Sequence, residues 1–189
     1  MILLKTLSQL PKFLKPGTDA DAVNAFLHAL NAAVLCFDRR YEDALVAANT
    51  ALAMQPDNPI AHFYALIAAA NTGRHSEALA TLKNFMKYTY AEGADEVIEQ
   101  AWAQDGITGA MRQAATIMAT RYSMSRSIPA DTAIFFAMAQ EFDEALKWLE
   151  RAYETRDPNM PYITLPVFDP LRSDPRFQDL LRRMNLPGG

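Results

Sequence analysis

The chain has 189 residues, of which 50% are hydrophobic and 21% charged, and its formal net charge is −4. This composition is typical of a globular protein and excludes a disordered or collagen-like one. A mildly acidic chain is also a poor candidate for sequence-independent nucleic-acid binding, which needs a dense basic surface. The single cysteine, Cys36, excludes an internal disulfide and a multi-cysteine metal site.

The sequence shows neither a membrane span nor a convincing secretory signal. The first apolar run is broken at Lys5, and no small-residue cleavage site follows it. Four leucines at helical spacing within residues 3–14 form a stripe near three lysines, which suggests a membrane-surface protein as a minor alternative. Because Pro11 interrupts that helix, this alternative is disfavoured and we expect a soluble, cytoplasmic protein.

Apolar residues recur three or four residues apart along most of the chain, and this is the period of a helix. Short polar turns separate the periodic stretches: Gln55–Pro59 cannot continue a helix, and Gly73 provides another stop. The first four helices are expected at about 21–37, 41–54, 59–71 and 75–88. Tyr162–Leu165 has some strand character, but prolines flank it and an extended connector is expected there. The pattern predicts an all-α protein.

A five-residue motif recurs along the chain: an aromatic residue or His, two mostly acidic residues, then Ala-Leu. It occurs at Tyr41–Leu45, His75–Leu79 and Phe142–Leu146. Ala44 and Ala78 are 34 residues apart, and Ala145 follows after 67, one short of two such periods. The motif resembles the tetratricopeptide repeat, a helix-turn-helix unit with a period of about 34 residues.

The resemblance implies four repeats that start near residues 25, 59, 92 and 126. The third rests mainly on this phase: it keeps Trp102 and Gly106 but has Thr108 and Met111 where the family has an aromatic residue and Ala. The implied fold is a right-handed α-solenoid of about four helical hairpins with a C-terminal capping helix. Small residues should let paired helices approach closely, so we expect Ala44, Ala78 and Ala145 to be buried between them. The alternative is an unrelated helical bundle with chance Ala-Leu pairs.

We expect three parts: an amphipathic segment at 1–16, the repeat array at 17–158, and a connector with a capping helix at 159–189. Asp169-Pro170 and Asp174-Pro175 each have the pattern of a helix N-cap followed by Pro. An apolar stripe then predicts a short helix that seals the array through Phe177, Leu180, Leu181 and Met184. The stretch 94–187 resembles the tail of bacterial multidomain signalling proteins, in which a kinase, cyclase or winged-helix domain precedes the repeats.

The sequence contains no constellation that indicates an enzyme: it has no phosphate loop, dinucleotide turn or nucleophile elbow. His28 and His62 occupy equivalent positions of neighbouring repeats, where two imidazoles could bind a metal. The family has a packed aromatic residue there and no third ligand is evident, so packing is the favoured interpretation. Cys36 is expected to be a buried structural thiol. We expect neither a cofactor nor catalysis.

In the tetratricopeptide family the first helices of successive repeats line a concave groove that holds a peptide. By position, the resemblance assigns the groove to Phe26, Ala29, Ala33, Phe37, Ile60, Phe63, Ile67, Asn71, Ile134 and Met138, with Cys36, Ala70, Ala130 and Ala137 beside them. Only Asn71 matches the residues that grip a C-terminal carboxylate in some members. The alternative is that these positions are core, covered by another part of the chain.

The leading hypothesis is therefore a non-enzymatic module that binds a peptide or protein partner through this groove. The rival is the regulatory tail of a bacterial signalling enzyme or transcription regulator, separated from its output domain. Residues 1–16 are too apolar for a free tail. We expect them to dock on the groove positions of the first two repeats, either within one chain or between two copies as a homodimer.

Overall fold

The computed structural model describes residues 20–89, 93–122 and 128–187, and in these ranges all regular structure is helical, without a strand. The prediction of an all-α protein is confirmed. The α-helices are α2 (Ala20–Phe37), α3 (Tyr41–Met54), α4 (Pro59–Asn71), α5 (His75–Thr89), α6 (Asp95–Tyr122), α7 (Pro129–Met138), α8 (Phe142–Glu154) and α9 (Pro175–Arg183). Two 3₁₀ helices, η2 (Met160–Thr164) and η3 (Pro166–Leu171), connect α8 to α9.

The predicted extended connector at Tyr162–Leu165 is wrong, because the 3₁₀ helix η2 occupies most of it. Pro161 lies in the first turn of η2, where its fixed φ angle suits a helix and its missing N–H costs nothing. The N-cap prediction is right for Asp174, whose carboxylate accepts a hydrogen bond from the Arg176 N–H at 2.8 Å. It is wrong for Asp169, which lies inside η3.

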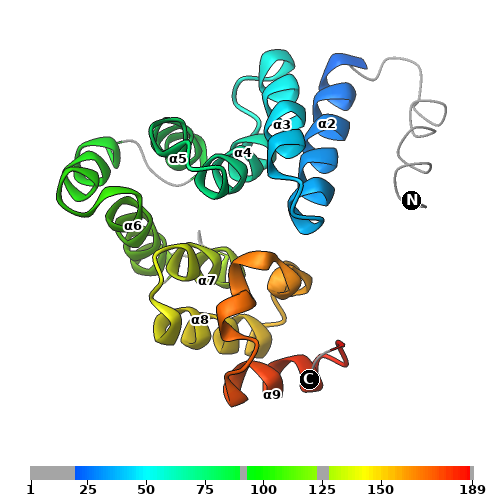
Figure 1. Cartoon of the computed structure of the whole chain (residues 1–189), viewed down its shortest axis with the longest axis vertical. Helices are drawn as coiled ribbons and strands as arrows, with labels where there is room; N and C mark the ends of the chain where they lie inside the picture. The colour runs from blue at the N-terminus through cyan, green and yellow to red at the C-terminus, as the bar shows by residue number, and fades with distance from the viewer. Residues whose placement is uncertain (1–19, 90–92, 123–127, 188–189) are drawn as a thin grey trace. The chain divides into compact units, whose positions relative to one another are not determined.

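The chain divides into two compact units, Met1–Thr89 and Tyr90–Gly189. In the first unit α2 pairs with α3 and α4 with α5, and α4 also contacts α2 and α3 (Figure 1). Every residue from Ala61 to Ala69 is buried, because α4 is apolar on all sides and lies between its neighbours. Its N-terminus is fixed by Asn58, whose side-chain oxygen accepts a hydrogen bond from the Ala61 N–H at 3.0 Å.

The turn within each hairpin contains a residue with positive φ: Arg39, Gly73, Gly106 and Gln140. These residues are 34, 33 and 34 positions apart, the same intervals as those between the predicted repeat starts. Gly106, with φ 56° and ψ −146°, bends α6 into two arms at a conformation that other residues rarely adopt. The arms approach closely, since a Cβ on Gly109 would lie 2.4 Å from the carbonyl oxygen of Ala101.

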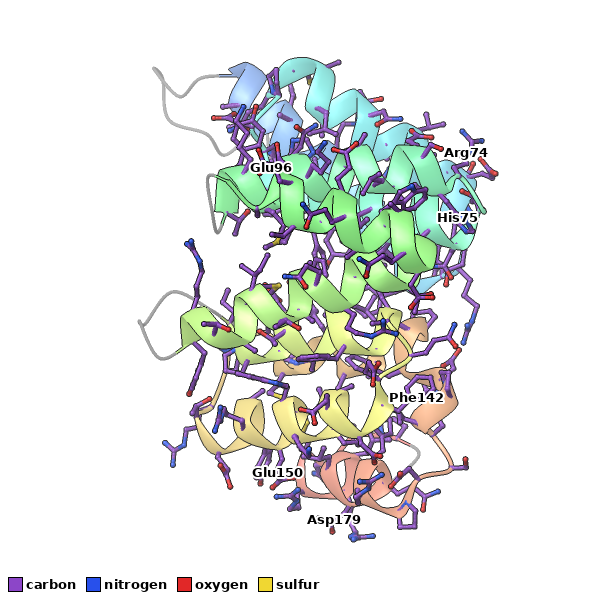
Figure 2. The ribbon with its side chains drawn as sticks, turned by 90° about the vertical axis from the view of Figure 1, so that its left-hand side faces the viewer. Arg74, His75, Glu96, Phe142, Glu150 and Asp179 are labelled. Atoms are coloured by element: carbon purple, nitrogen blue, oxygen red, sulfur yellow. The ribbon has the colours of Figure 1, made fainter. Side chains whose placement is uncertain are left out.

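In the second unit α7 pairs with α8, and α9 packs on α8. Phe177, Leu180 and Leu181 on α9 are buried, and the Phe177 ring lies 6.0 Å from that of Phe168. Figure 2 labels Glu150 on α8 and Asp179 on α9. Arg183 bonds both carboxylates, at 2.7 Å to Glu150 and 2.9 Å to Asp179. The helix α9 thus covers the outer side of α8 with an apolar face held by ion pairs.

Ala44, Ala78 and Ala145 are fully buried on the second helices of their hairpins, as predicted. Replacing Ala78 with Leu should overpack the α4–α5 contact and lower the free energy of unfolding by about 1–3 kcal/mol. Urea unfolding measures this change. Val46→Leu, at an exposed position of α3, is the matched control and should change stability by less than about 0.5 kcal/mol. Equal stability of the two variants would contradict the close packing at Ala78.

The packing of α9 on α8 leads to a second prediction. Phe177→Ala should lower the free energy of unfolding by about 3–5 kcal/mol, because it removes a fully buried ring from between α9 and its neighbours. The exposed Gln178→Ala on the same helix should have little effect. Thermal melts with light scattering should also show earlier aggregation for Phe177→Ala alone. A melt that coincides with that of the native chain would mean that α9 does not seal α8.

Candidate functional site

The ten residues predicted to line the groove come from three helices. Helix α2 carries four of them and α4 another four, and the two helices contact each other within the first unit. Ile134 and Met138 lie on α7 and form a separate pair in the second unit. The structure therefore brings eight of the ten together: Phe26, Ala29, Ala33, Phe37, Ile60, Phe63, Ile67 and Asn71.

Five of the ten side chains are buried: Ala29, Ala33, Phe63, Ile67 and Ile134. The Phe63 ring, for example, packs 5.7 Å from the Phe85 ring of α5. These five side chains contribute to helix packing, and in this conformation a partner does not reach them. Their burial agrees with the alternative that part of the predicted groove is core.

The other predicted residues of the first unit retain exposed surface. Phe26 is 45% exposed, Asn71 is exposed, and Phe37 and Ile60 are partly buried. Ile60 follows Phe26 by 34 residues and Asn71 follows Phe37 by 34, so each pair occupies equivalent positions of α2 and α4. We call these four residues the α2–α4 face. It offers apolar side chains and one amide, whose nitrogen donates to the Ile67 carbonyl at 2.8 Å.

A cleft that the sequence did not predict lies between α2 and α3. It has a volume of about 480 Å³, and its walls include His28 and Leu35 from α2 and Val46 from α3. Val46 is 69% exposed. At the rim the Arg40 guanidinium bonds the Asp43 carboxylate at 2.9 Å. The motif Tyr41–Leu45 predicted α3 from a pattern whose Ala-Leu pair is buried in the hairpin. No position of the repeat pattern predicted a site on the exposed side of α3.

Of the two histidines considered as metal ligands, His62 is arranged for packing, whereas His28 lies in the wall of the cleft between α2 and α3. His62 is buried, its ring stacks on that of Tyr88 with centroids 5.5 Å apart, and its Nε2 lies 2.8 Å from the Pro56 carbonyl oxygen. That short distance places the ring proton on Nε2 as donor, while burial lowers the pKa of His62 and favours the neutral ring. Within residues 20–89, 93–122 and 128–187, no group of three or more His, Cys, Asp or Glu side chains could hold a metal ion.

Cys36 is buried, as predicted, and its thiol donates to the Tyr64 carbonyl over 3.7 Å. Burial raises the pKa of Cys36 to about 12. The thiol therefore stays protonated at neutral pH, and a protonated thiol is a poor nucleophile. The contact instead joins α2 to α4, the two helices of the α2–α4 face.

A network of two carboxylates and one amide holds the N-terminus of α7. The Asp157 carboxylate accepts hydrogen bonds from the backbone N–H groups of Ala130, at 2.9 Å, and Asn159, at 2.8 Å. The Asn159 amide in turn donates to Asp131 at 3.0 Å. Burial, with a smaller contribution from the nearby Asp157 charge, raises the pKa of Asp131 to about 7, although the Asn159 bond opposes this shift.

In a comparison with known families, residues 37–84 match the model of the tetratricopeptide repeat family. The matched segment contains α3 and α4 and most of α5. No curated protein and no solved structure shows a significant match. A search of the helices in the described ranges finds none that is both long and apolar enough to cross a membrane. The expected docking of residues 1–16 lies outside the described residues.

The Asp131 network predicts a pH dependence of stability. Between about pH 4 and pH 7 the folded chain keeps a proton on Asp131 that the unfolded chain has lost, so this residue's contribution to stability falls as pH rises across that window. Asn resembles the protonated acid. Asp131→Asn should therefore match the native chain near pH 5 and exceed it in free energy of unfolding above pH 7.

Urea unfolding at several pH values tests this expectation. Asp95→Asn changes a first-turn aspartate on α6 and is the control. Its difference from the native chain should not grow between pH 5 and pH 8. If the Asp131→Asn difference is also constant over that range, Asp131 does not keep its proton in the folded chain.

Proposed function

We propose that this protein is a non-enzymatic interaction module of the bacterial cytoplasm whose α2–α4 face binds an apolar peptide segment of a protein partner. The tetratricopeptide repeat match supports the class of function, because such repeats generally mediate protein–protein interaction. The matched segment includes α4, which contributes half of this face.

The observation that carries the proposal is the exposure of Phe26 beside the equivalent positions of α4. A ring that is 45% exposed gains free energy when a partner covers it, and full burial of such a side chain is worth about 1.5–3 kcal/mol. Phe37 and Ile60 extend the apolar surface, and Asn71 offers an amide at its edge. The four side chains include no cation, so the face suits an apolar segment better than a carboxylate terminus.

The alternative function is the regulatory tail of a signalling enzyme or transcription regulator. The resemblance of 94–187 to such tails supports it, and those residues fall in the second compact unit, which α9 closes. A reading frame in which a kinase, cyclase or winged-helix domain precedes this chain would favour the alternative. The interaction surface would then serve that output domain.

A peptide-display library tests the main proposal. The native chain should enrich peptides with two or more large apolar side chains. Phe26→Ser combined with Asn71→Ala should weaken their affinity at least tenfold, because it removes the ring and the amide from the face. Val46→Ser, an equally drastic change at an exposed position of α3, is the matched control and should leave affinity unchanged. Failure to enrich any peptide, or equal loss in both variants, would contradict this site.

A further inference from the structure

We propose that residues 3–14 of this chain cover the first hairpin by docking on the outer side of α2. This outer side consists of four apolar residues that are only partly buried: Val23, Leu27, Leu30 and Val34. The opposite side of α2 carries Ala25, Ala29, Ala32 and Cys36, which are fully buried. The outer side is thus apolar along its length, which is unusual for a helix face left to water.

The second hairpin shows what this helix side does in the fold. The positions 34 residues after Leu27, Leu30 and Val34 are Ala61, Tyr64 and Ala68, and all three are buried. Ala61 packs in one cluster with Ala29 of α2 and Ala51 of α3, and the Tyr64 carbonyl accepts the Cys36 thiol. On α4, therefore, the preceding hairpin covers this side.

On α2 the same side has no described helix before it. Helix α2 forms the edge of the first unit among its four labelled helices (Figure 1). Its outer side also differs in size, because Leu27 and Val34 replace the small Ala61 and Ala68. The larger side chains fill the space that alanines leave for a close hairpin contact. This surface therefore suits a single apolar segment better than a second helical hairpin.

The spacing of the N-terminal leucines matches this surface. Leu3, Leu7, Leu10 and Leu14 are separated by four, three and four residues, and Val23, Leu27, Leu30 and Val34 have the same steps. Pro16-Gly17 is a turn signal in the short connector before α2 and allows the chain to reverse. A reversed segment then pairs Leu10 with Leu27, Leu7 with Leu30 and Leu3 with Val34. These three leucines precede Pro11, which interrupts the helical period.

The charges of the two stretches are complementary. Residues 1–16 contain three lysines and no acidic residue, whereas residues 17–38 contain three aspartates and no Lys or Arg. The opposite charges attract the segment to α2 and favour α2 over other surfaces as its docking site. The leucines contribute the apolar area that docking buries. A second copy stacked on α2 through its C-terminal end is disfavoured, because α9 already covers α8 there.

Crosslinking in the full chain tests the pairing. In a Cys36→Ala background, Leu7→Cys with Leu30→Cys should react with a short bismaleimide to give a crosslink within one chain. The matched control joins Leu7→Cys to Val46→Cys, since Val46 is highly exposed but lies on α3. The first pair should crosslink at least tenfold faster. Equal rates would overturn the proposal. A product made mainly of crosslinked dimers would also overturn it and would identify a second copy as the occupant.

A second measurement leaves α2 intact. Leu3, Leu7 and Leu10 are replaced together by Ser, and amide hydrogen exchange is compared with that of the native chain. Exchange in α2 should accelerate at least fivefold while that in α4 stays unchanged, because α4 is covered by the preceding hairpin. Lys5→Ser with Lys12→Ser is the control for changes in this segment and should have a smaller effect. Unchanged exchange in α2 after the leucine replacements would refute the docking.

Discussion

The close approach of helices at alanine positions is the constraint on which the rest of this structure depends. Ala29, Ala51 and Ala61 come from three different helices and form one buried cluster, against which Leu52 and Ile60 pack. Helix backbones can approach this closely only where side chains are small, and the larger neighbours then fill the space beside the contact. This packing fixes the rotation of α2 and α4 about their axes, and hence which residues of each helix remain exposed.

In an array of hairpins, each hairpin buries apolar surface against the hairpin before it and the hairpin after it. The first and last hairpins lack one of these neighbours, so each end of the array has an apolar surface without a cover. The C-terminal end is covered by α9, a nine-residue helix with three buried apolar side chains and an arginine that bonds two carboxylates. The same physical need exists at α2, whose outer side is apolar.

Charged residues join neighbouring elements at the surface rather than in the core. The Arg74 guanidinium, in the α4–α5 turn next to His75 (Figure 2), bonds Glu42 at the start of α3 at 2.5 Å. Arg112 and Glu141 are 2.7 Å apart between α6 and the start of α8. Exposed pairs of this kind contribute little to stability, typically below about 1 kcal/mol. The Asp131–Asn159–Asp157 network is different, because Asp157 is buried and its carboxylate must find hydrogen-bond partners within the protein.

The sequence alone determined α2 to α5 and their order, because period, proline and glycine act within a few residues of one another, whereas the 3₁₀ helices η2 and η3 were not predicted. Helix limits agree with the predicted ones to within about a residue for α2 to α5, and the turn at Gly106 was recognised even in the divergent third hairpin. The burial of Cys36 and of the three motif alanines was also predicted correctly, that of the alanines from the resemblance to the tetratricopeptide repeat.

Which of the predicted groove residues are exposed was decided by the tertiary structure alone. Phe26 and Phe63 were assigned to the same groove, yet one ring is 45% exposed and the other is packed against Phe85 of α5. The cleft beside Val46 likewise joins residues of α2 and α3, and the carboxylate network joins α7 to the turn after α8. The spacing within each helix did not reveal either one. Helical period reports which side of a helix is apolar, but burial depends on which neighbour covers that side. The neighbour is set by packing between elements that are distant in the sequence.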